Sequence, residues 1–174
     1  MTFLVSTAII IPSYNETLAL PELLGELKKG LENHDAVIVM DDSPKEISEQ
    51  IERKCREVVK DSEFVFLFDN SGSKSGRGAA VRRGITIALA EFPNVKSILE
   101  CDADGSHQPE DILKIKNSSS TADLLVGSRY LKSSQILGWP VSRRIFSWFL
   151  NKSIPKYQRI INSLNKTSKE FANV

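Results

Sequence analysis

The chain has 174 residues and a net charge of +1, and 41% of its residues are hydrophobic and 26% charged. This length and composition are typical of one soluble domain with a sizeable core, and they argue against a disordered, collagen-like or coiled-coil protein. The sequence contains no run of about 20 apolar residues, so no membrane-spanning helix is predicted. The N-terminus lacks a signal-peptide pattern, and the two cysteines match no disulfide or zinc framework. We therefore expect a cytoplasmic protein.

The charges are distributed unevenly along the chain. Residues 1–128 carry a net charge of −7, whereas residues 129–174 carry a net charge of +8. A basic segment on an acidic body predicts an anionic partner for that segment, such as a lipid phosphate, a membrane surface or nucleic acid. A solvated tail with little structure would carry the same charges, so this pattern alone leaves both interpretations open.

Apolar runs alternate with amphipathic helical patterns from residue 7 to residue 127. The first run, residues 7–12, is continuously apolar, as a strand buried on both faces is, and leucines spaced from Leu20 to Leu31 then predict a helix. Further on, the expected strands cover residues 36–40, 64–68, 95–101 and 124–127, and the expected helices cover residues 47–58, 81–92 and 109–116. This alternation indicates an α/β fold with a mostly parallel sheet flanked by helices.

Polar residues follow four of the expected strands. They are Ser13–Glu16, Asp41–Asp42, Asp102–Asp104 and Ser128–Arg129. Ligands of open α/β sheets bind beyond the carboxyl ends of the strands, so these four clusters are expected to meet in one crevice.

Two carboxylates one residue apart, Asp102 and Asp104, are the strongest local signal of chemistry. In a turn, both can reach one hard divalent cation, Mg²⁺ or Mn²⁺, which also binds substrate phosphates. The alternative is an acidic turn without a ligand. Asp41 and Asp42 can also be explained without a ligand, because an acid followed by an early proline is typical of a helix cap. Two adjacent acids nevertheless exceed what a cap requires.

Residues 71–78 read as a flexible loop that leads into a helix. The small residues Gly76, Gly78, Ala79 and Ala80 leave backbone N–H groups accessible at the start of this helix, which favours phosphate. An ordinary loop and helix start explain the same residues equally well.

After Arg129 the alternation of strands and helices stops. Apolar residues at i, i+4, i+7 and i+8 from Val141 predict an amphipathic helix over residues 141–152, with basic residues beside the apolar stripe. A basic helix with aromatic anchors is typical of a membrane interface, while the acidic body and the lack of RNA-binding signatures argue against nucleic acid. We therefore expect a domain over residues 1–135, followed by a basic helix and tail over residues 136–174.

Taken together and in this order, the motifs resemble family 2 glycosyltransferases with the GT-A fold, and most of all the dolichol- or polyprenol-phosphate mannosyltransferases. The matching segments are IIIPSYNE (9–16), VIVMDDSP (37–44), GRGAAVRRGI (76–85), ECDADGSHQPEDI (100–112), ADLLVGSRY (122–130) and GWPVSRR (138–144). The resemblance implies a single GT-A-type, Rossmann-like domain that binds a nucleotide sugar. Family members usually continue with a segment like Asp-x-Thr-Ser-Gly-Phe, which has no counterpart here, so we expect the usual C-terminal part to be missing or a partner subunit to supply it.

The resemblance also implies roles for the residues at the strand ends. The donor nucleotide would contact Pro12, Tyr14, Glu16, Asp41 and Asp42. The diphosphate and a Mg²⁺ or Mn²⁺ ion would be held by Asp102, Ala103 and Asp104, with Ser106 as a neighbouring metal ligand. Arg129 would face the donor or acceptor phosphate, and Asp104 and Arg129 are the expected catalytic residues.

The implied reaction is the metal-dependent, inverting transfer of a hexose such as mannose. It would pass from a nucleoside diphosphate sugar (GDP-mannose or UDP-glucose) to a polyprenyl or dolichyl phosphate, an anionic nucleophile that needs no general base. The helix over residues 141–152 would then lie at the membrane surface, on a cytoplasmic protein peripheral to the membrane. The alternatives are a family 2 transferase with a glycan hydroxyl acceptor, and a truncated, inactive module that binds a nucleotide sugar.

Overall fold

The computed structural model describes residues 4–128, 140–143, 145–150 and 152–153. The chain divides into two compact units, Met1–Gly127 and Ser128–Val174. The first unit holds a sheet with its helices. In the second unit, residues 141–143, 145–150 and 152–153 are helical.

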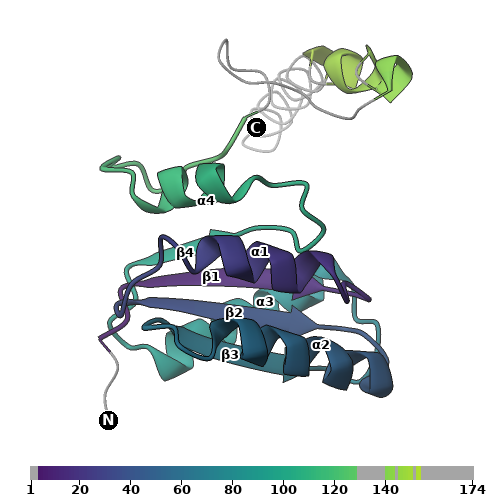
Figure 1. Ribbon diagram of the computed structural model, residues 1–174. Helices are drawn as coiled ribbons and strands as arrows, with labels where there is room; N and C mark the ends of the chain where they lie inside the picture. Colours follow the sequence, from purple (N-terminus) through teal and green to yellow (C-terminus); the bar gives the residue numbers. More distant parts are fainter. Residues whose placement is uncertain (1–3, 129–139, 144, 151, 154–174) are drawn as a thin grey trace, which may run out of the picture. The chain divides into compact units, whose positions relative to one another are not determined.

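Residues 4–128 form a four-stranded, fully parallel sheet in the order β3-β2-β1-β4 (Figure 1). The strands are β1 (Thr7–Ser13), β2 (Asp35–Asp41), β3 (Val65–Asn70) and β4 (Ser97–Glu100). The helices are α1 (Ala19–Leu27), α2 (Lys45–Val59), α3 (Arg77–Glu91) and α4 (Pro109–Lys116). Strands and helices alternate along the chain, which confirms the predicted α/β fold with its parallel sheet.

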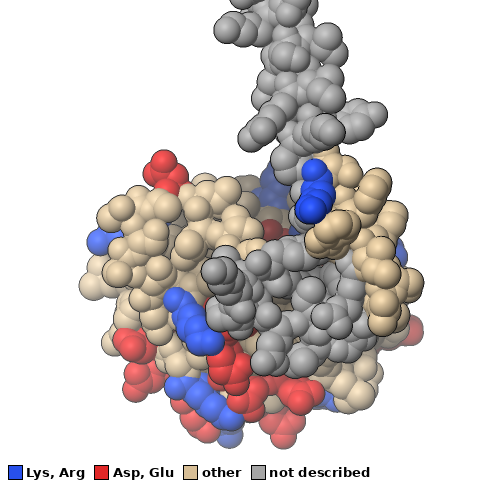
Figure 2. Space-filling view, turned by 90° about the horizontal axis from the view of Figure 1, so that it is seen from above, with Lys and Arg blue, Asp and Glu red and all other residues tan. Residues whose placement is uncertain are grey.

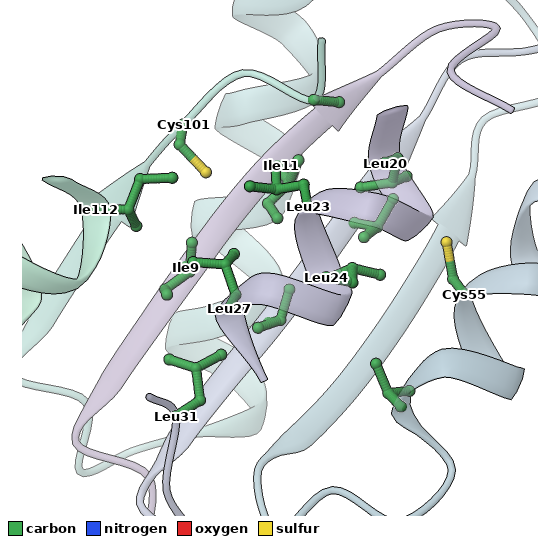
Figure 3. Close-up of a cluster of buried hydrophobic side chains, with 14 of the residues drawn as sticks. Ile9, Ile11, Leu20, Leu23, Leu24, Leu27, Leu31, Cys55, Cys101 and Ile112 are labelled. Atoms are coloured by element: carbon green, nitrogen blue, oxygen red, sulfur yellow. The ribbon is translucent and has the colours of Figure 1, made fainter. Parts of the chain in front are cut away.

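Helices cover both faces of this sheet. The helices α1, α2 and α4 pack on one face, and α3 packs on the other (Figure 1). Because successive side chains of a strand point to opposite faces, Ile9 and Ile11 join the cluster under α1 (Figure 3), whereas Ile10 joins the cluster under α3. Each buried isoleucine stabilises the fold by about 1.5–3 kcal/mol, so the two clusters fix the strand ends where the polar residues lie.

A glycine allows α3 to lie close to the sheet. A Cβ atom at Gly84 would lie 2.5 Å from Cγ2 of Ile10 and 3.0 Å from Cγ of Met40. A Cβ atom at Gly78, near the start of the same helix, would meet no atom within 4 Å. The close packing of α3 therefore depends on one glycine and not on the other.

A buried ion pair ties α4 to the start of β2. The Nζ atom of Lys116 lies 2.8 Å from the carboxylate of Asp35, and both side chains are almost completely buried. Removing one partner of such a pair costs more than the pair itself contributes, because the other charge is left buried without compensation. This contact fixes α4 and, with it, the turn that runs from β4 to α4.

Two predictions about the elements are wrong. The strand expected over residues 124–127 does not form, and Leu124 and Val126 are 78% and 69% exposed. A strand needs a neighbouring strand to pair with, and apolar composition alone does not supply one. The helix expected over residues 20–31 ends at Leu27, although Leu31 still reaches the same hydrophobic cluster from the turn that follows.

Charged side chains of both signs lie next to one another on the surface. Figure 2 shows Asp and Glu along the lower margin of this view, with Lys and Arg among them. Arg56 pairs with Glu52 within α2, and Lys29, in the turn after α1, pairs with Glu26. Exposed pairs of this kind contribute at most about 1 kcal/mol each, so the hydrophobic clusters stabilise the fold far more than these pairs do.

The helical residues of the second unit expose large apolar side chains. These include Val141, Ile145, Phe146, Trp148 and Phe149. The Nζ atom of Lys152 lies 4.4 Å from the ring centroid of Trp148. In the described part of the chain, no helix has the length and apolar character needed to cross a membrane.

Candidate functional site

The carboxyl ends of the parallel strands meet at one edge of the sheet. Ser13 at the end of β1 lies beside Asp41 at the end of β2, and Asp41 lies beside Asn70 at the end of β3. On the other side of β1, Ile10 pairs with Glu100 at the end of β4. The loops after all four strands therefore leave the sheet at one edge, and those after β1, β2 and β4 bring three of the four expected polar clusters there. The fourth cluster, Ser128–Arg129, does not follow a strand, because residues 124–127 are not part of the sheet.

Asp41 is fully buried beneath these loops. Its carboxylate accepts hydrogen bonds from the Ser43 hydroxyl at 2.8 Å and from the Asn70 side-chain amide at 3.3 Å. The Ser43 hydroxyl also accepts the backbone N–H of Asn15 at 2.8 Å, and Asn15 has a left-handed φ of 62°. Asp41 thus links the loops that follow β1, β2 and β3.

Asp42, only 4% exposed, is the centre of a denser network. Its Oδ1 atom accepts hydrogen bonds from the Ser71 hydroxyl at 2.8 Å and from Arg83 at 3.0 Å. Its Oδ2 atom accepts hydrogen bonds from the N–H and hydroxyl of Ser75 at 2.8 and 2.7 Å, and from the N–H of Gly76 at 3.0 Å. Burial alone raises its pKa, but the hydrogen bonds from Ser75, Ser71 and Arg83 lower that pKa to about 2. The carboxylate is therefore ionised at neutral pH, and both oxygens have protein partners.

Tyr14 and Glu16 lie in the loop after β1. Pro12 is half-buried and lies one residue before the end of the strand. The Tyr14 side chain is 39% exposed, and the Nζ atom of Lys74 lies 4.2 Å from its ring centroid, a cation–π contact. Burial and, to a lesser extent, the negative charge of Asp104 raise the pKa of Glu16. The loop after β1 and the turn after β4 therefore lie close enough for their carboxylates to repel each other.

Asp102 begins the turn after β4. Its Oδ1 atom accepts a hydrogen bond from Nε of Arg77 at 2.9 Å, and the same guanidinium lies 2.6 Å from the carboxylate of Glu100. The backbone N–H of Asp102 donates to Nδ1 of His107 at 3.1 Å. Arg77, the first residue of α3, thus bridges two carboxylates at the end of β4.

Asp104 is held by the backbone two residues further on. Its Oδ1 atom accepts the N–H of Ser106 at 2.9 Å, and Gly105 between them has a φ of 74°, which glycine adopts without strain. Hydrogen bonds from the backbone and then the hydroxyl of Ser106 lower the pKa of Asp104, so it is ionised at neutral pH. Ala103 is buried in the hydrophobic cluster under α1 and anchors the turn between the two acids.

The donor set of this turn fits a hard divalent cation together with phosphate ligands. Asp102 and Asp104 supply carboxylate oxygens, and Mg²⁺ is usually bound by one or two carboxylates together with substrate phosphates and water. Within residues 4–128 and the described helical residues after them, no group of three or more His, Cys, Asp or Glu side chains could hold an ion. The remaining ligands would have to come from the Ser106 hydroxyl, a bound diphosphate and water.

The thiol before this turn does not supply a nucleophile. Burial, and then the charges of Asp102 and Glu100, raise the pKa of Cys101 to about 12. The thiol is therefore protonated at neutral pH. The chemistry of this turn depends on its carboxylates and on the cations that face them.

Three cations that complete the network were not among the predicted site residues, namely Lys74, Arg77 and Arg83. Lys74 and Arg77 lie in residues 71–78, which were expected to be a flexible loop, and Arg83 lies in the helix expected after it. One signal was present, since an arginine in the first turn of a helix opposes the helix dipole and indicates an acidic partner elsewhere. α3 begins at Arg77, inside the segment expected to be a loop. Arg129 lies outside the described residues.

Comparison with known proteins places this geometry in context. Residues 8–172 match the family described as Glycosyl transferase family 2. The chain is 35% identical over 158 residues to an undecaprenyl-phosphate mannosyltransferase of Micrococcus luteus, a match that covers 91% of this chain and 60% of that protein. It is 31% identical over 156 residues to a polyprenol monophosphomannose synthase of Mycolicibacterium smegmatis, covering 89% and 55% of the two chains. It is 34% identical over 146 residues to a dolichol-phosphate mannosyltransferase of Pyrococcus furiosus, covering 80% and 38%. The chain thus spans between 38% and 60% of the length of these relatives.

Proposed function

The chain belongs to glycosyl transferase family 2, and from this premise we propose that it transfers a hexose from a nucleoside diphosphate sugar to a polyprenyl or dolichyl phosphate. Mannose and the lipid phosphate are the first candidates, because they appear in the names of the relatives it matches. The donors to distinguish are GDP-mannose and UDP-glucose. The transfer inverts the anomeric carbon, since the acceptor attacks from the face opposite the leaving group.

One observation supports this proposal above the others, the gathering of an aromatic ring and several carboxylates at one sheet edge. The exposed ring of Tyr14 can stack on a nucleotide base, and Glu16 can accept hydrogen bonds from its polar edge. Asp102 and Asp104 suit the cation that accompanies a diphosphate. Pro12 is the remaining candidate and is only half-buried, whereas Asp41, Asp42 and Ala103 are buried. We therefore propose that these three residues support the donor site by holding its loops in place.

The chemistry at this edge concerns the leaving diphosphate. When bound, Mg²⁺ or Mn²⁺ would neutralise the negative charge that develops on that group. Asp102, Asp104 and the Ser106 hydroxyl are the proposed ligands. Asp104 suits this role because its lowered pKa keeps it ionised at neutral pH.

The acceptor needs orientation more than activation. A lipid phosphate is already anionic at neutral pH, so a cation that positions it replaces a general base. Arginine binds phosphate oxygens in bidentate fashion, and we assign this role to Arg129, with Arg143 as the alternative. Arg129 and Asp104 are therefore the residues proposed to act on the reacting groups.

The helical residues between 141 and 152 are proposed to lie at the membrane surface, where the lipid acceptor resides. Their exposed side chains, including Phe146, Trp148 and Phe149, are those of interfacial helices, and Lys152 adds positive charge. This arrangement corresponds to a protein peripheral to the membrane on its cytoplasmic side.

The test combines binding with transfer. Thermal unfolding is followed with GDP, GDP-mannose, UDP and UDP-glucose, each with and without Mn²⁺, because a ligand of the folded state raises the midpoint. We expect a Mn²⁺-dependent shift for one nucleotide, and transfer of its labelled hexose to polyprenyl phosphate. Asp104→Asn should reduce transfer roughly 100-fold or more, whereas Asp61→Asn, at an exposed position after α2, should leave transfer unchanged.

Three outcomes would contradict the proposal in different ways. Transfer to a glycan hydroxyl with none to lipid phosphate would assign another acceptor. A nucleotide-dependent shift without transfer to any acceptor would identify an inactive binding module, or a chain that needs a partner subunit. No shift with any nucleotide would remove the proposed donor site itself.

A further inference from the structure

One short segment contacts three residues of the proposed donor site. Residues 71–77, here called the strap, connect β3 to α3 and touch Asp42, Tyr14 and Asp102. We propose that the strap occupies the donor site of the free protein, and that the donor binds by displacing Lys74 from the Tyr14 ring and Arg77 from the Asp102 carboxylate. This inference rests on the proposed function, because both concern the same site.

Asp42 anchors the strap at both ends. The Ser71 hydroxyl binds one carboxylate oxygen, and the N–H groups of Ser75 and Gly76 bind the other. Arg83 reinforces this anchor, since it donates to Asp42 at 3.0 Å and to the Ser75 hydroxyl at 2.7 Å. These hydrogen bonds involve a buried charge and are costly to break. The ends of the strap should therefore stay in place while other parts of it move.

The two cations of the strap are held far more weakly than its ends. Lys74 and Arg77 are exposed, and exposed cation–π contacts and ion pairs compete with water and salt. Gly72 and Gly76, with φ values of 69° and 88°, flank Lys74, and a Cβ atom at either would meet no atom within 4 Å. Lys74 thus has both the backbone freedom and the space to leave the ring while the anchor at Asp42 remains.

The donor would take the positions that these cations hold. Lys74 covers one face of the Tyr14 ring, with its Nζ atom 4.2 Å from the ring centroid, and a base that stacks on this face would take its place. Arg77 occupies one carboxylate oxygen of Asp102 at 2.9 Å, and its positive charge opposes a divalent cation at either oxygen. Once displaced, both side chains lie next to a diphosphate, which offers them new anionic partners. The strap therefore opposes binding of the base and of the metal, and then contributes positive charge to the complete donor.

The first experiment isolates the base from the phosphates. Lys74→Ala removes the cation over the ring and leaves the anchor at Asp42 intact. Guanosine and uridine, titrated by NMR, carry no phosphate that could attract a lysine, so the nucleoside that binds should bind this variant about two- to five-fold more tightly. Lys60→Ala, at an exposed lysine directly after α2, is the matched control and should bind as the unmodified protein does.

The second experiment isolates the metal. Arg77→Gln removes the charge that competes for Asp102, so Mn²⁺ alone, followed by the electron paramagnetic resonance of the free ion, should bind about two- to five-fold more tightly. Arg56→Gln removes an exposed arginine that pairs with Glu52 within α2, and it should leave Mn²⁺ binding unchanged. Amide exchange of the unmodified protein adds a separate measurement, because residues 72–74 should exchange faster with nucleoside present while Ser75 and Gly76 stay protected.

The outcomes separate this inference from the proposed function. Suppose that the unmodified protein binds GDP or UDP with Mn²⁺, but Lys74→Ala and Arg77→Gln bind nucleoside and Mn²⁺ no more tightly than it does. The proposal about the strap is then contradicted, while the proposed donor site is retained. If the variants bind and the unmodified protein does not, the strap is supported. If neither binds any nucleoside or nucleotide, the proposed function falls and this inference falls with it.

Discussion

A single carboxylate, that of Asp42, determines how the loops at the site are arranged. It lies directly after β2, yet its partners all lie between β3 and the middle of α3, namely Ser71, Ser75, Gly76 and Arg83. Because the group is buried and ionised, the loop after β3 has one strongly preferred position instead of several weakly preferred ones. At the scale of residues, the position of the loop after β3 thus depends on the charge of Asp42 more than on apolar contacts.

We expect Asp42→Asn to lower the free energy of unfolding by about 2 kcal/mol at pH 7, because the pKa of Asp42 is about 2 against an ordinary value of 3.8. A lowered pKa stabilises the fold in full above the ordinary value, and this stabilisation is lost as the pH falls toward 2. The difference between the two proteins in urea unfolding should therefore shrink from pH 6 to pH 3. A difference of equal size at both pH values would assign the effect to packing of the amide instead of loss of the charge. Asp61→Asn, at an exposed position, is the control.

At the scale of elements, the distance between α3 and the sheet is set at Gly84. Gly84→Ala places a Cβ atom against Ile10 and Met40, at 2.5 and 3.0 Å, and overpacking of this kind costs about 1–3 kcal/mol. Gly78→Ala in the same helix meets no atom within 4 Å, and alanine favours a helix over glycine by up to about 1 kcal/mol. Thermal unfolding should thus rank Gly78→Ala at or above the unmodified protein and Gly84→Ala below it. Equal midpoints for the two variants would mean that α3 moves away from the sheet without cost.

Elements are predictable from the sequence where their signals are local. α4 runs from Pro109 to Lys116 as predicted, because a proline in its first turn and lysines in its last turn mark both ends. The strand expected over residues 124–127 failed because pairing depends on a distant partner. The strap was missed for the same reason, since Ser71 and Ser75 lie 29 and 33 positions from Asp42, and no local pattern identifies the carboxylate they bind. The edge where Tyr14, Asp102 and Asp104 gather was predictable, because parallel strands end on the same side.

At the scale of the whole molecule, the net charges of −7 over residues 1–128 and +8 over residues 129–174 are expected to decide which surface the chain binds. Each lysine or arginine near an anionic leaflet contributes about 1 kcal/mol, and salt screens this attraction. We expect the chain to sediment with vesicles that contain phosphatidylglycerol, to bind neutral phosphatidylcholine vesicles much more weakly, and to lose anionic binding between 0.05 and 0.5 M salt.

The aromatic side chains of the helical residues between 141 and 152 make a separate contribution to vesicle binding, which salt does not screen. Trp148→Ala should weaken vesicle binding about tenfold, because an aromatic side chain loses at least about 1.5 kcal/mol of apolar burial. Leu89→Ala, which removes an exposed apolar side chain from α3, should leave vesicle binding unchanged. If binding is sensitive to salt but indifferent to Trp148, the basic segment attracts anions without inserting into the lipid, and an interfacial helix is excluded. If both dependences are found together, charge brings the chain to the leaflet and the aromatic face holds it there, where a lipid phosphate acceptor would be within reach.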